Sequence, residues 1–177
     1  DKKVLLMGMD LRLPRLSEYL NIDTGHGMSQ FLSGNENNIL DIVQPSGINP
    51  NLSVISAGAI PLNPAELIAR TEFEKGMEVL RQKFDYIIID SAPVSLVTDT
   101  IVASRVADAT MYVCRANYSR KTNLRFANDL SDKKMLPNMG LVVNDVSNFH
   151  SGYGTDGSYS SYGYGYNKDN KKKKRIF

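Results

Sequence analysis

The sequence predicts an α/β fold with a mostly parallel sheet and helices on both faces, followed by a flexible tail. Three observations predict it: near-continuous apolar runs recur along the chain, helix-like patterns separate them, and the composition changes near residue 150. Runs without polar alternation are typical of strands that are covered on both faces, as in a parallel sheet. Strands that alternate with helices imply right-handed crossovers within an open sheet.

Five apolar segments are predicted to be strands. They are residues 4–9, 52–57, 86–90, 109–115 and 140–146. In an open α/β sheet, ligands bind beyond the carboxyl ends of the strands. The residues directly after these runs are therefore the candidates for a functional site.

The first predicted helix follows the second strand. Its start is predicted by Asn63 as the N-cap, Pro64 at the first helical position and Glu66 at the third. These three residues suit a helix start by their local chemistry alone.

Three more helices are predicted from apolar spacing. Residues 71–83 carry Phe73, Met77 and Leu80 at spacings of four and three, which gives one apolar stripe. Residues 100–106 and 122–132 are predicted to be helices of the same kind.

The length and composition fit one folded domain with a tail. A chain of 177 residues that is 42% hydrophobic can bury one ordinary core. We predict a folded part over residues 1–150 and a flexible part over residues 151–177. The lone Cys114 and two histidines cannot form a disulfide framework or a multi-ligand His/Cys zinc site, so Cys114 is predicted to be a small buried hydrophobe.

The net charge is unevenly distributed. The whole chain carries +2, but residues 167–177 alone carry +5, which leaves residues 1–166 at −3. A protein that binds nucleic acid neutralises phosphates with a basic face. The acidic folded part therefore argues against nucleic acid as a partner.

Two of the predicted strands lead to an aspartate. Asp10 follows the first strand, and Asp90 ends the third strand after four hydrophobic residues. A hydrophobic strand that closes on Asp has the form of a Walker B strand, whose carboxylate meets nucleotide-bound Mg²⁺ directly or through water. Because Mg²⁺ prefers one or two carboxylates with phosphate oxygens, Asp10 and Asp90 together predict a magnesium site. The alternative is that each Asp only caps the helix that follows.

Six short motifs occur in order along the chain, at residues 5–14, 27–34, 61–67, 84–93, 113–116 and 140–145. The first continues a strand into Asp-x-Arg-x-Pro, the second begins Gly-x-Ser, and the third contains Asn-Pro-x-Glu-Leu. With a terminal tyrosine cluster, this order resembles the kinase domain of bacterial tyrosine kinases, the deviant-Walker P-loop proteins of capsule and exopolysaccharide synthesis. The resemblance covers essentially the whole chain and implies a P-loop NTPase-like fold.

The resemblance implies ATP and Mg²⁺ as cofactors and a role for each matched residue. Asp10 and Asp90 would organise Mg²⁺ and help the incoming tyrosine hydroxyl, and Arg12 would lie near the phosphates or at a subunit contact. Asn144 would read the adenine edge, or it is a simple turn residue. Arg115 would orient the site, or it forms a surface ion pair.

Two departures from the family pattern limit this transfer of roles. The first Walker A′ aspartate of the family is Gly8 here, so no role of that carboxylate, including general base, transfers. Nothing matches the Gly-Lys-Ser/Thr loop that supplies the backbone amides and lysine for the β- and γ-phosphates. We therefore expect that the chain is the carboxyl-terminal part of a longer protein and that it binds ATP poorly by itself.

Residues 151–166 are rich in Gly, Ser and Tyr and hold no aliphatic residue, so they are predicted to be flexible. The resemblance implies that subunits of a ring phosphorylate the tyrosines of this segment on one another: Tyr153, Tyr159, Tyr162, Tyr164 and Tyr166. Each phosphate adds about −1.5 to −2 charges, so five would outweigh the basic end of the chain. The alternative is a solubilising low-complexity terminus.

The resemblance also implies partners and a location. The partners are the chain's own subunits in a ring-like homo-oligomer, an inner-membrane polysaccharide chain-length regulator, fused or separate, and a tyrosine phosphatase, but no nucleic acid. The basic residues 171–175 fit proximity to anionic lipid, at about 1 kcal/mol per residue. The expected location is the cytoplasmic side of the bacterial inner membrane.

The sequence thus predicts an ATP-dependent protein-tyrosine autokinase domain that regulates capsular or exopolysaccharide synthesis and export. Two alternatives stay open. One is a non-catalytic regulatory or assembly module of the export machinery, with Gly8 as the mark of lost activity. The other is a deviant-Walker ATPase of the partition type, against which the clustered tyrosines speak.

Overall fold

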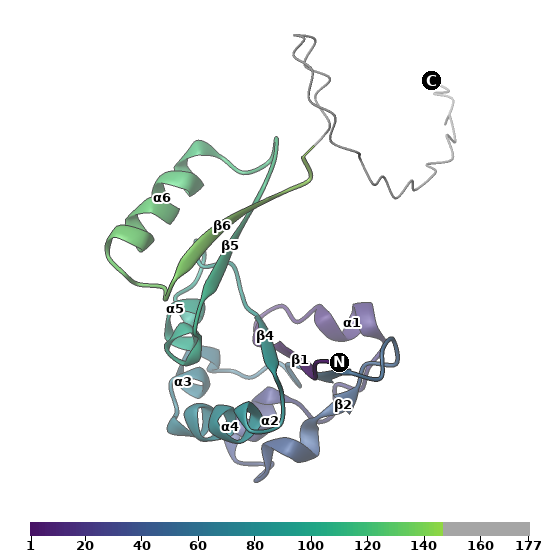
Figure 1. The fold of residues 1–177 in the computed structure, drawn as a ribbon. Coiled ribbons are helices and arrows are strands. Elements are labelled where there is room, and N and C mark those ends of the chain that lie inside the picture. The colour runs from purple at the N-terminus through teal and green to yellow at the C-terminus, as the bar shows by residue number, and fades with distance from the viewer. Residues whose placement is uncertain (147–177) are drawn as a thin grey trace, which may run out of the picture. The chain divides into compact units, whose positions relative to one another are not determined.

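A computed structural model describes residues 1–146 of the chain (Figure 1). These residues form two sheets, one with the strand order β2-β3-β1-β4 and one with the order β5-β6. All strand pairs are parallel except β2 with β3. The strands are β1 Val4–Gly8, β2 Gln44–Pro45, β3 Leu52–Ile55, β4 Tyr86–Asp90, β5 Thr110–Arg115 and β6 Met139–Asn144. The five predicted strands and the mostly parallel sheet are confirmed.

The helices lie between these strands in chain order. They are α1 Leu16–Leu20, α2 Met28–Ser33, α3 Pro64–Ile68, α4 Thr71–Arg81, α5 Asp99–Ala103 and α6 Lys121–Asp132, with 3₁₀ turns η1 Ile39–Ile42 and η2 Ser104–Val106. The predicted helices after Asn63 and at 71–83, 100–106 and 122–132 are confirmed, the third as α5 followed by η2. Helices α1 and α2, the turn η1 and the two-residue strand β2 were not predicted from the sequence.

The main core lies on one face of the first sheet. Leu5 and Met7 of β1 are fully buried there, and their register partners in β4 are Ile87 and Ile89. Helices α2 and α4 cover this face with their own buried side chains: Met28, Phe31, Leu32, Phe73, Met77 and Leu80. The predicted stripe of α4 is thus the side of the helix that enters the core.

The opposite face of the first sheet is covered less completely. Helix α1 reaches it beside Gly8, because Leu16 Cδ2 lies 3.5 Å from the position that a Cβ at residue 8 would take. Farther along the same face, Tyr86 and Ile88 of β4 are 58% and 48% exposed. Helices therefore lie on both faces of β1, while this face of β4 is open.

The predicted start of α3 is right in position but wrong in its hydrogen bond. Pro64 occupies the first turn, as expected, yet the Asn63 side chain accepts no bond from the helix backbone. Instead its Nδ2 donates to Glu66 Oε2 at 2.6 Å. The carboxylate of Glu66 competes for the side chain that would otherwise cap the helix.

The segment at residues 27–34 folds as α2 because its first glycine allows a close approach of two backbones. A Cβ at Gly27 would clash with Gly58 N and would stand 2.5 Å from Ser56 Oγ. This contact brings Met28 N–H within 2.9 Å of the Ser56 carbonyl, to which it donates. The glycine therefore fixes α2 at the carboxyl end of β3.

Two arginines connect the elements that follow. Arg105 donates to the carboxylate of Glu74 and lies over the ring of Phe73, 5.4 Å from its centroid. Arg81, at the end of α4, donates through Nη1 and Nη2 to the two carboxylate oxygens of Asp108, both at 3.1 Å. Asp108 lies two residues before β5, so the start of the second sheet is fastened to α4.

The second sheet carries α6 on one face. Tyr112 of β5 donates from its hydroxyl to the Asn123 carbonyl of α6 at 3.3 Å, and Cys114 is 4% exposed, as predicted for a small buried hydrophobe. Figure 1 shows α6 alongside β5 and β6. In the part of the chain that the structure describes, no helix has the length and apolar character for a membrane span.

The predicted tail lies outside the described residues. This applies to the basic residues 171–175 and to the candidate phosphorylation sites Tyr153, Tyr159, Tyr162, Tyr164 and Tyr166.

Candidate functional site

Asp10 and Asp90 lie at the same end of the first sheet, where strands β1 and β4 terminate. Strands β1 and β4 are parallel neighbours, and Gly8 pairs in register with Asp90. One residue later, Met9 N–H donates to the Asp90 carbonyl at 2.7 Å. The two strand ends on which the magnesium prediction depends are therefore adjacent.

The loop after β1 is built around the Asp10 carboxylate. Its Oδ1 accepts the backbone N–H groups of Arg12 at 3.1 Å and Leu13 at 3.0 Å. This turn reverses the chain directly after the strand, and it holds Asp10 at the sheet edge. Within residues 1–146, the second carboxylate oxygen of Asp10 is open to a ligand.

The surroundings of Asp90, including Asp10, change the pKa of its carboxyl group. Although Asp90 is exposed, partial desolvation by neighbouring atoms raises the pKa of its carboxyl group, and the negative charge of Asp10 raises it further. A pair of carboxylates that repel each other at the end of a parallel sheet is a fitting place for a hard divalent cation. The donor set matches Mg²⁺, which takes one or two carboxylates and completes its shell with water and phosphate oxygens.

Gly8 stands where the resemblance leads one to expect the first Walker A′ aspartate. Because Gly8 pairs with Asp90 across parallel strands, a side chain at residue 8 would project on the same face of the sheet as Asp90. Its Cβ would stand 3.1 Å from the backbone N of Ala57, so the space is tight. The chain therefore has one acidic group fewer beside Asp90, in a place that a larger residue enters only if its neighbours shift.

The Arg12 side chain holds the carboxylate of Asp99. Its Nε donates to Asp99 Oδ2 at 2.6 Å and its Nη2 donates to Asp99 Oδ1 at 3.1 Å. The Asp99 side chain is only 4% exposed, while the Arg12 side chain is 44% exposed. This pairing raises the pKa of Arg12, mainly through the hydrogen bond to Asp99. The fork joins the loop after β1 to the first turn of α5.

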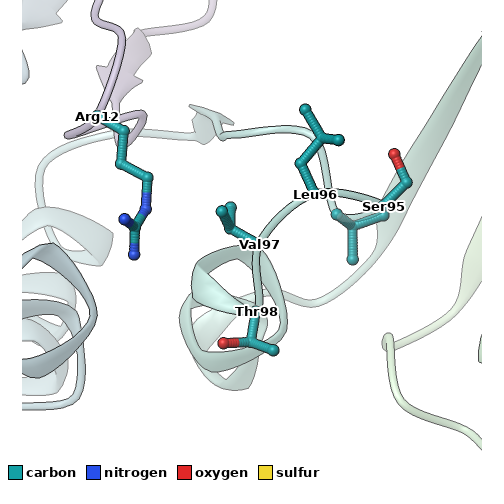
Figure 2. A pocket seen from close by; sticks show the side chains of 6 residues that line it. Arg12, Ser95, Leu96, Val97 and Thr98 are labelled. Carbon is teal, nitrogen blue, oxygen red and sulfur yellow. The ribbon is translucent and has the colours of Figure 1, made fainter.

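A shallow depression of about 380 Å³ lies beside this fork. Figure 2 shows Arg12 on one side and the loop between β4 and α5 on the other. The lining residues are Arg12, Val94, Ser95, Leu96, Val97 and Thr98. The loop is held by Thr100, whose hydroxyl donates to the Ala92 carbonyl at 2.5 Å. The depression thus adjoins the strand that ends in Asp90.

Arg115 and Asn144 lie together at the carboxyl end of the second sheet. They are register partners on β5 and β6, and Arg115 Nε donates to Asp145 Oδ2 at 2.8 Å. The guanidinium also lies 5.6 Å from the ring centroid of Tyr118. Asn144 Oδ1 accepts the N–H of Asp145 at 2.8 Å. Each of the two residues has a structural partner, and each stands at a strand end. The structure is therefore compatible with a role in the site and with a purely structural role for both.

The structure thus forms two groups from the predicted site residues. Asp10 and Asp90 lie together on the first sheet, and Arg115 and Asn144 lie together on the second. Within residues 1–146, no group of three or more His, Cys, Asp or Glu side chains could hold a metal ion by itself. A cation at Asp10 and Asp90 would therefore need ligands from a nucleotide or from water.

Asp99 was not predicted as a site residue from the sequence. Thr98-Asp99 directly precedes an apolar helical pattern, so the available signal was that of a helix start, which Asp favours. Nothing in the local sequence connects Asp99 with Arg12, 87 residues away.

Comparison with known proteins identifies the family, although no family model matches the chain. The chain is 30% identical over 158 residues to tyrosine-protein kinase CpsD of Streptococcus agalactiae, which covers 89% of this chain and 68% of that protein. It is 35% identical over 153 residues to tyrosine-protein kinase ptk of Acinetobacter johnsonii, which covers 86% of this chain.

A solved structure agrees with these sequence relatives. The kinase domain of the Escherichia coli tyrosine kinase ETK superposes with a TM-score of 0.77 at 25% identity, over 94% of this chain and 61% of that structure. The chain spans only 21% of the Acinetobacter protein, and about two thirds of the shorter streptococcal one. On this similarity of sequence and fold, the chain belongs to the family of bacterial tyrosine-protein kinases.

Proposed function

We propose that the chain is the carboxyl-terminal part of an ATP- and Mg²⁺-dependent protein-tyrosine kinase that phosphorylates its own tyrosine cluster between subunits. In this proposal residues 1–150 belong to the kinase domain and residues 151–177 form the tail that is modified. The regulated process is capsular or exopolysaccharide synthesis and export. The names of the relatives support the reaction class, since they are tyrosine-protein kinases.

The observation that carries the proposal is the adjacency of Asp10 and Asp90. The two carboxylates stand at neighbouring strand ends, and the pKa of Asp90 is raised first by desolvation and then by the negative charge of Asp10. Both would hold Mg²⁺, which when bound neutralises phosphate charge. Phosphoryl transfer depends mainly on positioning and charge neutralisation, so the loss of one family carboxylate at Gly8 is compatible with activity.

The chain's own residues have defined tasks in this reaction. The tyrosine oxygen forms a bond to the γ-phosphorus of ATP, and the bond from that phosphorus to the β-phosphate oxygen breaks, so that ADP leaves with the electron pair. The hydroxyl proton passes to a carboxylate of the site or to water. Arg12 positions the loop after β1 through Asp99, which keeps Asp10 at the sheet edge.

The second group of residues would serve the nucleotide. Asn144 has its Oδ1 engaged by Asp145 N–H, which leaves the Nδ2 donors for the adenine edge. Arg115 holds Asp145 and so positions the turn that carries Asn144. We propose that the loop for the β- and γ-phosphates comes from polypeptide outside residues 1–177, because a Gly-Lys-Ser/Thr sequence is absent from them.

The partners and the location follow from the same assignment. A ring of subunits would bring one tail to the site of its neighbour, and an inner-membrane polysaccharide chain-length regulator would place the kinase on the cytoplasmic side of the membrane. A tyrosine phosphatase would reset the tail. The +5 charge of residues 167–177 would favour docking of the unmodified tail on anionic surfaces, and phosphorylation of the tail would weaken this docking.

The test is phosphotyrosine mapping by mass spectrometry after the chain, expressed together with its preceding coding sequence, is incubated with ATP and Mg²⁺. We expect phosphate on the tail tyrosines Tyr153, Tyr159, Tyr162, Tyr164 and Tyr166, and its loss in Asp10→Asn and Asp90→Asn. Asp129→Asn, an exposed change on α6, is the matched control and should keep the phosphate. An unmodified wild-type tail, or equal modification of all variants, would count against the kinase.

A non-catalytic regulatory module is the second candidate, and Gly8 favours it. The residue leaves Asp90 without the neighbouring family carboxylate, in a space where a Cβ would meet the Ala57 backbone. In that case the tail would stay unmodified in the experiment above. A catalytically active relative, treated in the same way, is the positive control and should become phosphorylated.

A further inference from the structure

A second hollow, of about 450 Å³, lies at the amino ends of β1 and β3. Asp10 and Asp90 stand at the carboxyl ends of β1 and β4, so this amino-end hollow is at the opposite end of the first sheet. Its walls come from the starts of the two strands, from η1 and from the segment after α4. The volume is in the range of pockets that bind small ligands or single side chains of a partner.

The alternation of side chains along β1 directs Lys3 to this hollow. Leu5 and Met7 of β1 face the core under α2 and α4. Because side chains alternate between the two faces of a strand, Lys3 projects on the same face as Leu5, just outside the core. Ser53 of β3, the register partner of Leu5, projects on that face as well. An ammonium group and a hydroxyl group therefore line the hollow where the core face of the sheet ends.

The wall opposite the strands is apolar. Leu40 and Val43, in and directly after η1, pack against the core together with Phe84, which follows α4. All three side chains are half-buried, and all three also line the hollow. The hollow therefore offers an aromatic ring and two aliphatic side chains to a ligand with an apolar body.

A second lysine adds to the positive charge of the hollow. Lys83 follows the end of α4, where its N–H donates to the Leu80 carbonyl at 3.0 Å. Among residues 1–146, none of the ion pairs includes Lys3 or Lys83. The carboxylate of Asp85 does not neutralise these lysines, because it accepts the Lys3 backbone N–H at 2.8 Å and the ammonium of Lys2 at 3.0 Å. The hollow thus combines two positive charges with an apolar wall.

This combination suits an aryl phosphate. A phosphate monoester carries about −1.5 to −2 charges near neutral pH, which matches two ammonium groups, whereas a carboxylate carries one. Lysine binds phosphate as a point charge, without the fixed fork of arginine. Phosphotyrosine joins such a phosphate to an aromatic ring. The chain's own sequence holds five tyrosines within residues 151–166, a segment with one Asp and no Lys or Arg.

We infer that the amino-end hollow binds a phosphorylated tyrosine side chain from a second copy of the chain. The phosphate would lie between Lys3 and Lys83, and the ring would lie against Phe84 and its aliphatic neighbours. The inference rests on the proposed function only for the source of the phosphate. A modified tail would be held at the amino end of the sheet, which leaves the end with Asp10 and Asp90 to a tail that still carries free hydroxyl groups.

Synthetic peptides test the inference without any phosphate transfer. The chain is expressed with its preceding coding sequence, treated with a tyrosine phosphatase that is then removed, and kept free of ATP. Fluorescence anisotropy measures its binding to a labelled peptide of residues 156–166 with phosphate on Tyr162. The same peptide without phosphate, or with phosphate on Ser161 instead, should bind about tenfold more weakly, since each lacks either the charge or its attachment to the ring. Equal binding of the three peptides would overturn the inference.

Lysine variants locate the binding site. Lys3→Gln and Lys83→Gln should each weaken binding of the Tyr162 phosphopeptide by about tenfold, because each removes a charged donor to the phosphate. Lys75→Gln, also an exposed change but in the middle of α4, is the matched control and should bind as the wild type does. Urea unfolding should show the same stability for all three, since their side chains are exposed. An equal loss of binding in the three variants, or none, would contradict the assignment.

Methyl NMR separates this hollow from the catalytic end. The phosphopeptide should shift the methyl signals of Leu40 and Val43 and leave those of Leu96, which lines the depression beside Arg12, unchanged. Shifts at Leu96 alone would assign the peptide to the catalytic end and overturn the inference. Binding to phosphatidylserine vesicles that depends on both lysines, without preference for the phosphotyrosine peptide, would overturn it in favour of a lipid surface. A kinase assay that fails while this binding is observed would remove only the proposed function.

Discussion

The guanidinium of Arg12 holds the carboxylate of Asp99 through two hydrogen bonds, of 2.6 and 3.1 Å. The carboxylate is buried, and the loop after β1 is thereby joined to the start of α5. The loop that carries Asp10 is thus held by a contact with a distant part of the chain. Arg12 also lines the depression beside this loop (Figure 2).

Replacement of Arg12 by Met should destabilise the folded chain. The change leaves Asp99 buried without its partner, so we expect the free energy of unfolding to fall by about 2 kcal/mol, less than for a pair with both partners buried, because Arg12 is half exposed. Arg15→Met is the matched control, since its ion pair with Glu18 is exposed on both sides and should contribute about 0.5 kcal/mol or less. Urea unfolding measures both, and equal losses would contradict the special role of Arg12.

Asp10→Asn should lower the pKa of Asp90. The substitution removes one negative charge but keeps the Oδ1 that accepts the N–H groups of Arg12 and Leu13. The pKa should stay above its ordinary value, because desolvation is the larger cause of the shift. Carboxyl NMR titration in the absence of Mg²⁺ gives the value, and Asp129→Asn serves as a control that should not move it.

The same shift predicts how stability depends on pH. A raised pKa means that folded Asp90 holds its proton more tightly than unfolded Asp90, whose pKa is about 3.9. Asp90 therefore lowers stability above its folded pKa, and this cost disappears as the pH falls below about 3.9. Asp10→Asn should accordingly stabilise the chain at neutral pH, on the order of 0.5 kcal/mol for such exposed groups, and have no such effect at acidic pH.

Gly8→Asp should restore a carboxylate beside Asp90 at a cost in stability. The new Cβ would meet Ala57 N at 3.1 Å and Leu16 Cδ2 at 3.5 Å, so we expect a loss of about 1 kcal/mol from crowding. Gly8→Asn has nearly the same shape and is the matched control. Both variants should lose similar stability at low pH, but only Gly8→Asp should raise the pKa of Asp90 further. A similar pKa in the two variants would show that residue 8 does not reach Asp90.

Arg105→Lys should loosen the contact between α4 and η2. Arg105 donates to both oxygens of Glu74 and to the carbonyl groups of Ile68, Arg70 and Val102, a fork that Lys cannot reproduce. We expect a loss of about 1.5 kcal/mol in urea unfolding near pH 7. Arg125→Lys, an exposed change on α6, is the control and should cost little.

The Arg105 variant also carries a pH signature. Arg105 lowers the pKa of Glu74, so the contribution of this pair is present above the unfolded value of about 4.3 and is lost as the pH falls through the lower folded value. The difference between wild type and Arg105→Lys should therefore shrink below about pH 4. A difference that is constant from pH 7 to pH 3 would assign the effect to the carbonyl bonds alone.

Part of the candidate site could be predicted from the sequence, and part could not. Asp10 and Asp90 were predicted from their positions at strand ends, and the parallel register of β1 with β4 places those ends together. Asp99 could not be predicted as the partner of Arg12, because a pair 87 residues apart depends on how α5 docks. The short helix α2 was missed for a related reason: it depends on the contact of Gly27 with Gly58 rather than on an apolar stripe.

By itself, the sequence determined the strands, the longer helices and the residues that stand at the strand ends. These features depend on local apolar runs, on spacing within a helix and on turn residues. Each of these patterns lies within about ten neighbouring residues. Only the tertiary structure decided that Arg12 binds Asp99 and that, within residues 1–146, β4 and β5 each pair with a strand on one side only. Those outcomes depend on competition among distant partners for the same hydrogen-bonding groups, and packing decides that competition.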